Sequence, residues 1–210
     1  MKVSVSFLSN EYKSNEIIKK ANNTDCDYLH VDIMDGKFVK NKSFTYGEVK
    51  KLVGNSNKKL DVHLMVSNPL KYIEDYALLN TEYLTFHYEN VKNIDEVIET
   101  IKSYGLKVGI SIKPKTNIKG IIPYLENIDQ VLIMSVEPGA SGQEFKESIL
   151  YKIEVLRKTI DEKNLKTIIS VDGGINEETA GLVKEKGADM VVSSSFVANG
   201  DMSERINSLR

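Results

Sequence analysis

One segment in the first fifth of the chain reads His30-Val31-Asp32-Ile33-Met34-Asp35-Gly36. The pattern is typical of a buried strand that ends in a loop, because every second residue from Leu29 to Ile33 is apolar. The opposite face carries an imidazole, a carboxylate and a thioether, from His30, Asp32 and Met34. On a solvent-facing strand this would be an ordinary polar face, so one strand alone does not indicate a site.

Two further segments deliver the same kinds of side chain. Asp61-Val62-His63-Leu64-Met65 repeats the alternation, with its polar residues and its methionine on one face. A third strand-like segment, 168–171, runs into Asp172-Gly173-Gly174. The three strands therefore carry two imidazoles and two carboxylates near their C-terminal ends. This set of groups predicts a site for a divalent transition metal, formed by His30, Asp32, His63 and Asp172.

The composition limits the classes of protein to consider. The chain has 210 residues and a formal net charge of −2, which fits one domain with a sizeable core. Its lysines are scattered rather than clustered, so nucleic-acid and membrane-surface roles have little support. No apolar run is long enough to span a bilayer, and we expect no signal peptide. The single cysteine, Cys26, excludes an internal disulfide and suits the reducing cytoplasm.

Strand-like and helix-like segments alternate along the chain. Strands are expected at residues 3–8, 28–33, 60–65, 83–87, 107–112, 130–135, 167–171 and 190–193. Helices are expected at residues 15–21, 47–53, 69–79, 94–104, 145–163, 177–186 and 203–209, with a turn and a helix up to residue 125. Eight such repeats predict a closed (β/α)8 TIM barrel, in a single domain over residues 1–210. Active sites of this fold lie at the C-terminal ends of the strands.

Loops rich in glycine and serine follow the last three strands. Gly139-Ala140-Ser141-Gly142 follows the sixth strand, Gly173-Gly174 the seventh and Ser193-Ser194-Ser195 the eighth. In any one loop, glycines can serve only a tight turn. Three such loops on adjacent strands of a barrel predict a phosphate site that is built from backbone N–H groups.

These segments together resemble the ribulose-phosphate 3-epimerase family over nearly the whole chain. The resemblance is carried by Ser6-Phe7-Leu8-Ser9, by segments 30–36 and 61–65, and by Met134-Ser135-Val136-Glu137-Pro138-Gly139 and Val171-Asp172-Gly173-Gly174-Ile175. It implies a (β/α)8 barrel that interconverts D-ribulose 5-phosphate and D-xylulose 5-phosphate in the pentose phosphate pathway. It also implies proton transfer at C3 by two bases, through an enediolate that a divalent metal ion stabilises.

The resemblance implies roles residue by residue. It makes His30, Asp32, His63 and Asp172 the metal ligands, and Asp32 and Asp172 the two acid/base carboxylates. Substrate contacts are implied for Ser6, His63, Met34, Met65 and Met134. Contacts on the phosphate side are implied for Gly139, Ala140, Ser141, Gly142, Gly173, Gly174, Ser194 and Ser195. The metal is Zn, Fe(II), Mn or Co, since all tolerate this ligand set. The expected partner is a sugar phosphate, without nucleic acid or membrane, and the expected state is a cytoplasmic homo-oligomer.

Four positions depart from the family pattern. The loop 139–142 reads Gly-Ala-Ser-Gly where Gly-Phe-Gly-Gly is usual, Ser194 stands where glycine is usual, and Val5 replaces a proline. A Cβ atom at Ser141 or Ser194 is expected to hinder the approach of backbone to phosphate, whereas a serine hydroxyl could donate to it.

Other functions stay open at this point. A 3-epimerase of a six-carbon ketose phosphate, such as allulose 6-phosphate, would share the ligand set. An aldolase or a decarboxylase on the same barrel needs a lysine at a strand end, which segment 61–65 lacks. A non-catalytic sugar-phosphate binding protein would not need the pair Asp32 and Asp172. His87, with Glu89 two residues on, is interpreted as a hydrogen-bonded structural histidine.

Overall fold

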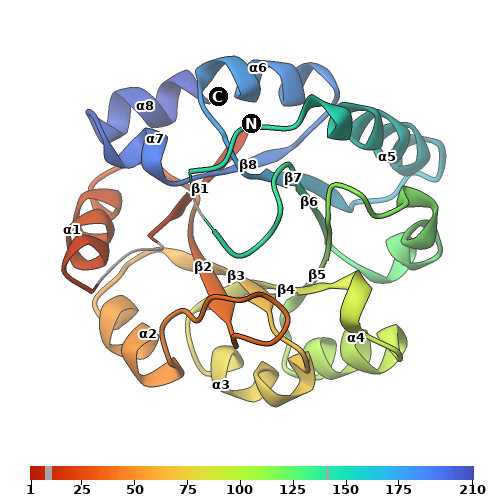
Figure 1. The fold of residues 1–210 in the computed structure, drawn as a ribbon, viewed down its shortest axis with the longest axis horizontal. Helices are drawn as coiled ribbons and strands as arrows, with labels where there is room; N and C mark the ends of the chain where they lie inside the picture. The colour runs from red at the N-terminus through yellow and green to blue at the C-terminus, as the bar shows by residue number, and fades with distance from the viewer. Residues whose placement is uncertain (8–10, 141) are drawn as a thin grey trace.

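Eight parallel strands close into a barrel in chain order (Figure 1). The computed structural model describes residues 1–7, 11–140 and 142–210. The strands are β1 Lys2–Ser6, β2 Tyr28–Met34, β3 Lys59–Met65, β4 Thr81–His87, β5 Lys107–Ile112, β6 Gln130–Met134, β7 Ile168–Asp172 and β8 Met190–Ser193. The barrel closes where β1 pairs with β8, with Lys2 opposite Met190. The predicted single-domain (β/α)8 barrel is confirmed.

Helices surround the strands on the outside of the barrel (Figure 1). The α-helices are α1 Glu11–Asn22, α2 Tyr46–Val53, α3 Ile73–Ala77, α4 Ile94–Ser103, α5 Leu150–Glu162, α6 Glu177–Glu185, α7 Ser195–Ala198 and α8 Met202–Ser208. The 3-10 helices are η1 Pro69–Lys71, η2 Tyr88–Asn90, η3 Ile118–Gly120, η4 Ile122–Asn127 and η5 Glu147–Ile149. Among the described residues, no helix has the length and apolar character needed to cross a membrane.

Several connections differ from the predicted ones. Between β5 and β6 the chain forms η3 and η4 instead of an α-helix. One α-helix through both is disfavoured because Pro123, which would lie in its interior, has no N–H to donate. Helix α5 begins at Leu150, after η5, rather than at residue 145. Helix α7 has four residues, too few to show a helical period in the sequence. Leu8 and Ser9 of the first family-like segment, and Ser141 of the predicted phosphate loop, lie outside the described residues.

The strands are buried on both faces, as parallel strands are. Val31 and Val62 belong to the large apolar cluster that the strands form with the surrounding helices. The alternate residues face the inside of the barrel, where Asp61 accepts hydrogen bonds from Ser4 at 3.1 Å and from Gln130 at 3.3 Å. The polar faces of β2 and β3 therefore meet inside the barrel rather than solvent.

The register of the sheet places the predicted site residues level with one another. In the ladder between β2 and β3, Asp32 pairs with His63 and His30 pairs with Asp61. Paired residues on neighbouring strands point to the same side of a sheet, so these four side chains share the barrel interior.

Gly109 on β5 lies opposite Thr85 on β4, where the barrel interior has no room for a side chain. A Cβ atom at Gly109 would lie 2.1 Å from the Thr85 hydroxyl oxygen. We therefore expect Gly109→Ala to lower the free energy of unfolding by roughly 1–3 kcal/mol, the usual cost of overpacking a core. Urea denaturation measures this change.

Gly181→Ala is the matched control for that substitution. Gly181 lies inside α6, and a Cβ atom there has no neighbour within 4 Å. Alanine favours a helix over glycine by about 1 kcal/mol, so this variant should be as stable as the wild type or more stable. If Gly109→Ala were as stable as Gly181→Ala, the expected overpacking of the barrel interior would be contradicted.

Candidate active site

The four predicted metal ligands come together at the C-terminal end of the barrel. His30 and Asp32 come from β2, His63 from β3, and Asp172 is the last residue of β7. One ligand atom from each lies within 4.8 Å of the others. The histidine side chains are fully buried, whereas the side chains of Asp32 and Asp172 are 9% and 18% exposed. The carboxylates therefore reach the solvent side of the cluster while the imidazoles lie behind them.

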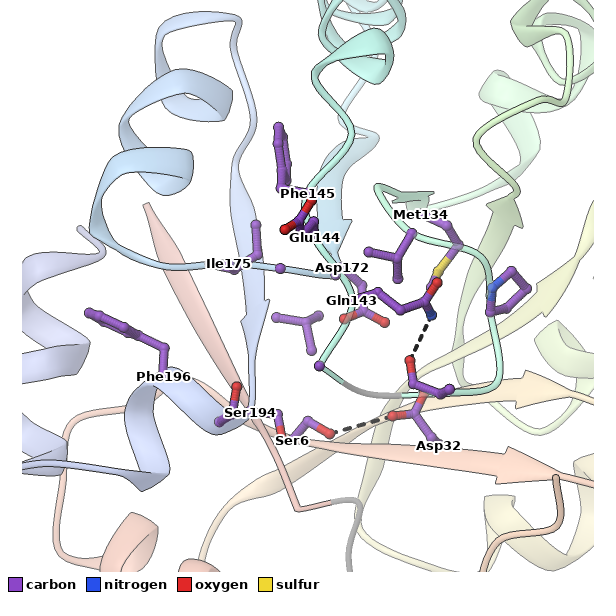
Figure 2. A pocket seen from close by; sticks show the side chains of 18 of the residues that line it. Ser6, Asp32, Met134, Gln143, Glu144, Phe145, Asp172, Ile175, Ser194 and Phe196 are labelled. Atoms are coloured by element: carbon purple, nitrogen blue, oxygen red, sulfur yellow. Dashed lines mark hydrogen bonds between the residues drawn. The ribbon is translucent and has the colours of Figure 1, made fainter.

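The short distances converge on Asp32. Its Oδ1 atom lies 3.0 Å from His63 Nδ1 and 3.3 Å from His30 Nε2, and Asp172 Oδ2 lies 4.0 Å from the same His30 nitrogen. The second oxygen, Asp32 Oδ2, accepts a hydrogen bond from the Ser6 hydroxyl at 3.4 Å, drawn in Figure 2. One oxygen of Asp32 thus faces the histidines and the other faces the cavity.

His30 offers a nitrogen that suits a metal ion. Its Nδ1 atom lies 2.7 Å from Asp61 Oδ2, so a proton on Nδ1 satisfies that carboxylate. Its Nε2 atom is buried and has no hydrogen-bond partner among the described residues. A buried, unpaired ring nitrogen that points at two carboxylates is unfavourable by itself, and a divalent cation would satisfy it. The donor set of two imidazoles and two carboxylates fits such an ion.

The ionisable groups of the cluster perturb one another strongly. Burial lowers the pKa of His30, but the carboxylates of Asp32 and Asp61 outweigh it and raise that pKa well above its usual range. Burial raises the pKa of Asp32, yet His30 and His63 outweigh it and hold that pKa far below its usual range. Burial and the nearby charge of Asp32 raise the pKa of Asp172 to about 6. A bound cation would favour the ionised form of both carboxylates.

A third histidine lies directly behind the cluster. His87 Nε2 lies 2.9 Å from His63 Nε2, and His87 Nδ1 lies 3.0 Å from Glu89 Oε2. Burial lowers the pKa of His87 to about 4, against the raising effect of the Glu89 hydrogen bond. The sequence indicated only a satisfied histidine here. The spacing of two residues between His87 and Glu89, directly after a strand, was the available signal for this contact.

A cavity of about 560 Å³ opens in front of the two carboxylates (Figure 2). Among the described residues, it is lined by every predicted site residue except the two histidines, which lie behind it. Those lining residues are Ser6, Asp32, Met34, Met65, Met134, Gly139, Ala140, Gly142, Asp172, Gly173, Gly174, Ser194 and Ser195. No lysine occurs among the described residues that line it, so the Schiff-base aldolase lacks its nucleophile here.

The glycine-rich loops adopt backbone conformations that need glycine. Gly173 and Gly174 have φ angles of 118° and 62°, and a Cβ atom at Gly174 would lie 2.7 Å from the Phe145 backbone nitrogen. Ser194, where the family usually has glycine, has a φ angle of −115°. This backbone accepts a side chain without left-handed strain. The loop after β6 is held by Gln143, whose side chain donates to the carbonyl oxygens of Glu137 and Ala140.

One charged residue at the cavity was not predicted. Arg205, on α8, is the only cationic side chain among the described lining residues. Its guanidinium group packs 4.4 Å from the ring of Phe196 and donates to the Phe196 carbonyl oxygen at 3.2 Å. It follows the last strand by more than ten residues and belongs to no motif, so local sequence carried no signal for it.

Comparison with known proteins identifies the family. The model of the ribulose-phosphate 3 epimerase family matches residues 2–198. This chain belongs to that family. The ribulose-phosphate 3-epimerase of Bacillus subtilis is 37% identical, over 100% of this chain and 98% of that protein. The ribulose-phosphate 3-epimerase of Methanocaldococcus jannaschii is 38% identical, over 100% of this chain and 90% of that protein. The chain is therefore an epimerase, and the family favours this activity over the aldolase, decarboxylase and non-catalytic alternatives.

Solved structures of more distant proteins share the fold. A mutant tryptophan synthase alpha-subunit from Pyrococcus furiosus superposes with a TM-score of 0.69 at 12% identity, over 99% of this chain and 96% of that chain. The N-(5'-phosphoribosyl)anthranilate isomerase of the same organism gives a TM-score of 0.63 at 15% identity, over 100% and 96%. At these identities the likeness concerns the barrel alone.

Proposed function

We propose that the protein inverts C3 of D-ribulose 5-phosphate to give D-xylulose 5-phosphate, with residues 1–210 as one catalytic domain. The observation that carries this proposal is the pair of carboxylates, Asp32 and Asp172, which come from well-separated strands and line one cavity beside a metal-ligand cluster. Family membership supports the reaction class. A 3-epimerase of a six-carbon ketose phosphate would share this cluster, so the activity assay should include allulose 6-phosphate.

His30, Asp32, His63 and Asp172 would hold one divalent ion, which is Zn, Fe(II), Mn or Co. When bound, the ion would act as a Lewis acid toward substrate oxygens that gain negative charge. The unpaired Nε2 atom of His30 supports this assignment.

Inversion at C3 requires that a proton leave one face of the carbon and that another return on the opposite face. Asp32 and Asp172 would hold these protons on their carboxylate oxygens, one on each face. Ser6 orients Asp32 by donating to Oδ2, the oxygen that does not face the histidines. The substrate would lie against Met34, Met65 and Met134, whose apolar side chains keep water away and strengthen charge interactions.

The phosphate group would lie at the loops after β6, β7 and β8. Backbone N–H groups of Gly139, Ala140, Gly142, Gly173, Gly174, Ser194 and Ser195, together with those of Ser141 outside the described residues, are the proposed contacts. Arg205 supplies positive charge to the same cavity, where it would compensate for Ser141 and Ser194, which stand where the family usually has glycine.

The cytoplasmic location of the protein and its homo-oligomeric state stay predictions. Cys26 is buried and free, which is compatible with the expected reducing cytoplasm. The expected homo-oligomer can be checked by light scattering.

The metal assignment can be tested with His63→Ala. The purified wild type should contain about one divalent ion per chain and lose its epimerase activity on treatment with a chelator. The variant should lose both metal and activity, because one of the two imidazole ligands is gone. Elemental analysis measures the metal, and a coupled assay on ribulose 5-phosphate measures the activity. An unchanged metal content in the variant would remove His63 from the ligand set.

The phosphate assignment can be tested with free ribulose. Binding energy at the phosphate positions the reacting carbon, so free ribulose should show a lower kcat as well as weaker binding. Arg205→Met, which keeps an apolar chain over Phe196, should raise KM for the 5-phosphate about tenfold, since a hydrogen bond to a charged group contributes roughly 1.5–3 kcal/mol. Free ribulose should respond little to that variant. Equal kcat/KM for the two sugars would contradict the phosphate site.

The two-base mechanism can be tested with Asp32→Asn and Asp172→Asn, provided that the metal content of each variant is measured. In a variant that keeps its metal, epimerisation should fall by about 10²–10⁴-fold. Each variant should still exchange the C3 proton of one epimer with deuterated solvent, and the two variants should prefer opposite epimers. Nuclear magnetic resonance follows this exchange.

Glu144→Gln is the control for these variants, because Glu144 also lines the cavity but lies outside the cluster. It should retain most of the activity and exchange both epimers. If both aspartate variants exchanged both epimers equally, a single mobile base would be the better mechanism.

A further inference from the structure

The two ring nitrogens of His63 have different neighbours: one faces the metal-ligand cluster and the other faces His87. Its Nδ1 atom lies 3.0 Å from Asp32 and faces the cluster. Its Nε2 atom points away from the cluster and lies 2.9 Å from the Nε2 atom of His87. Two ring nitrogens at this distance must share one hydrogen, with one ring as donor and the other as acceptor. The direction of this hydrogen bond decides which nitrogen of His63 carries a lone pair.

Glu89 decides that direction. Its Oε1 atom accepts hydrogen bonds from the backbone N–H of Lys113, at 2.6 Å, and from the hydroxyl of Thr116. Its Oε2 atom lies 3.0 Å from His87 Nδ1. A carboxylate only accepts, so the proton of a neutral His87 ring lies on Nδ1 and its lone pair on Nε2. His63 must then carry its proton on Nε2, which leaves a lone pair on Nδ1, toward the cluster.

We propose that His87 and Glu89 are positioning residues that fix the tautomer of His63, so that its Nδ1 atom is presented as a metal ligand. This inference rests on the metal site of the proposed function. The tautomer of His30, the other histidine of the cluster, is fixed without an intervening ring, because Asp61 contacts Nδ1 of His30 directly. In both histidines a carboxylate on the side away from the ion fixes which ring nitrogen keeps a lone pair for the ion: Asp61 for His30, and Glu89, through His87, for His63.

The surroundings of His87 and Glu89 hold this chain of hydrogen bonds in place. Lys152, on α5, is fully buried, and its ammonium group donates to the carbonyl oxygens of residues 113, 114 and 116 at 3.0, 2.7 and 2.7 Å. It thereby anchors the loop after β5, which supplies both donors to Glu89. On the other side, the ring of Phe38 packs 4.6 Å from the ring of His87, which is fully buried.

Glu89→Gln would reverse the chain of hydrogen bonds while keeping its shape. The two donors from the loop after β5 require an oxygen, so the amide NH2 group would face His87 Nδ1 and donate to it. His87 would then carry its proton on Nε2 and donate to His63, whose own proton would move to Nδ1. We expect the dissociation constant of Zn²⁺ to rise about 10–100-fold, the usual effect of changing a partner of a metal ligand.

His87→Gln changes the shape more but keeps the polarity. Its amide oxygen can accept from His63 while its NH2 group donates to Glu89. We therefore expect this variant to lose less Zn²⁺ affinity than Glu89→Gln. If His87 and Glu89 had only a packing role, the order would be the opposite, because glutamine replaces glutamate with almost no change in volume.

Glu82→Gln is the matched control. Glu82 lies on the same strand, β4, but at its other end, where it pairs with Lys59 and Lys107. This variant should bind Zn²⁺ like the wild type. Competition with a fluorescent chelator gives the affinities, and urea denaturation shows whether each variant is folded.

The tautomers can also be observed directly in the Zn²⁺-loaded wild type. Two-bond ¹H–¹⁵N spectra should place the proton of His63 on Nε2 and that of His87 on Nδ1. A proton of His63 on Nδ1, wild-type affinity in Glu89→Gln, or a greater loss in His87→Gln than in Glu89→Gln would each overturn the inference. A wild type that binds no Zn²⁺ would instead overturn the proposed metal site, and this inference with it.

Discussion

Buried polar atoms must find partners, and this constraint governs the centre of the barrel. One ligand atom from each of two imidazoles and two carboxylates lies within 4.8 Å of the others, and the imidazoles are fully buried. Asp61 satisfies the rear nitrogen of His30, and His87 satisfies the rear nitrogen of His63. Both rings consequently turn their remaining nitrogen toward Asp32. The interior of the barrel is thus arranged around a position for positive charge.

The convergence of the four proposed metal ligands could be predicted because it depends on two local regularities. A strand alternates its side chains with a period of two, which separates His30 and Asp32 from Leu29 and Val31. A closed parallel barrel places all C-terminal strand ends at one rim, so residues from β2, β3 and β7 meet there although Asp32 and Asp172 are far apart in sequence. Each step uses only the sequence pattern and the fold class.

Other parts of the site depend on contacts that no local pattern records. His87 contacts His63 only because β3 and β4 are neighbours and both side chains point inward. Arg205 reaches the cavity because α8 packs back on α7, where the guanidinium group covers Phe196. The backbone at Ser194 is a third case: its φ angle is negative, so the side chain causes no left-handed strain, and the expected hindrance to phosphate stays a prediction. Tertiary placement decided all three.

The pairing of β1 with β8 has a consequence for how the protein is made. Lys2 and Met190 are partners in this ladder, so the sheet closes only after its last strand, β8, has left the ribosome. Until then, the nascent protein exposes one unpaired strand edge at β1 and another at the latest strand to emerge, and such edges can pair with other chains. Once the ring is closed, no edge is left. Association between finished copies must then use helices or loops, because the sheet itself offers no place to add a strand.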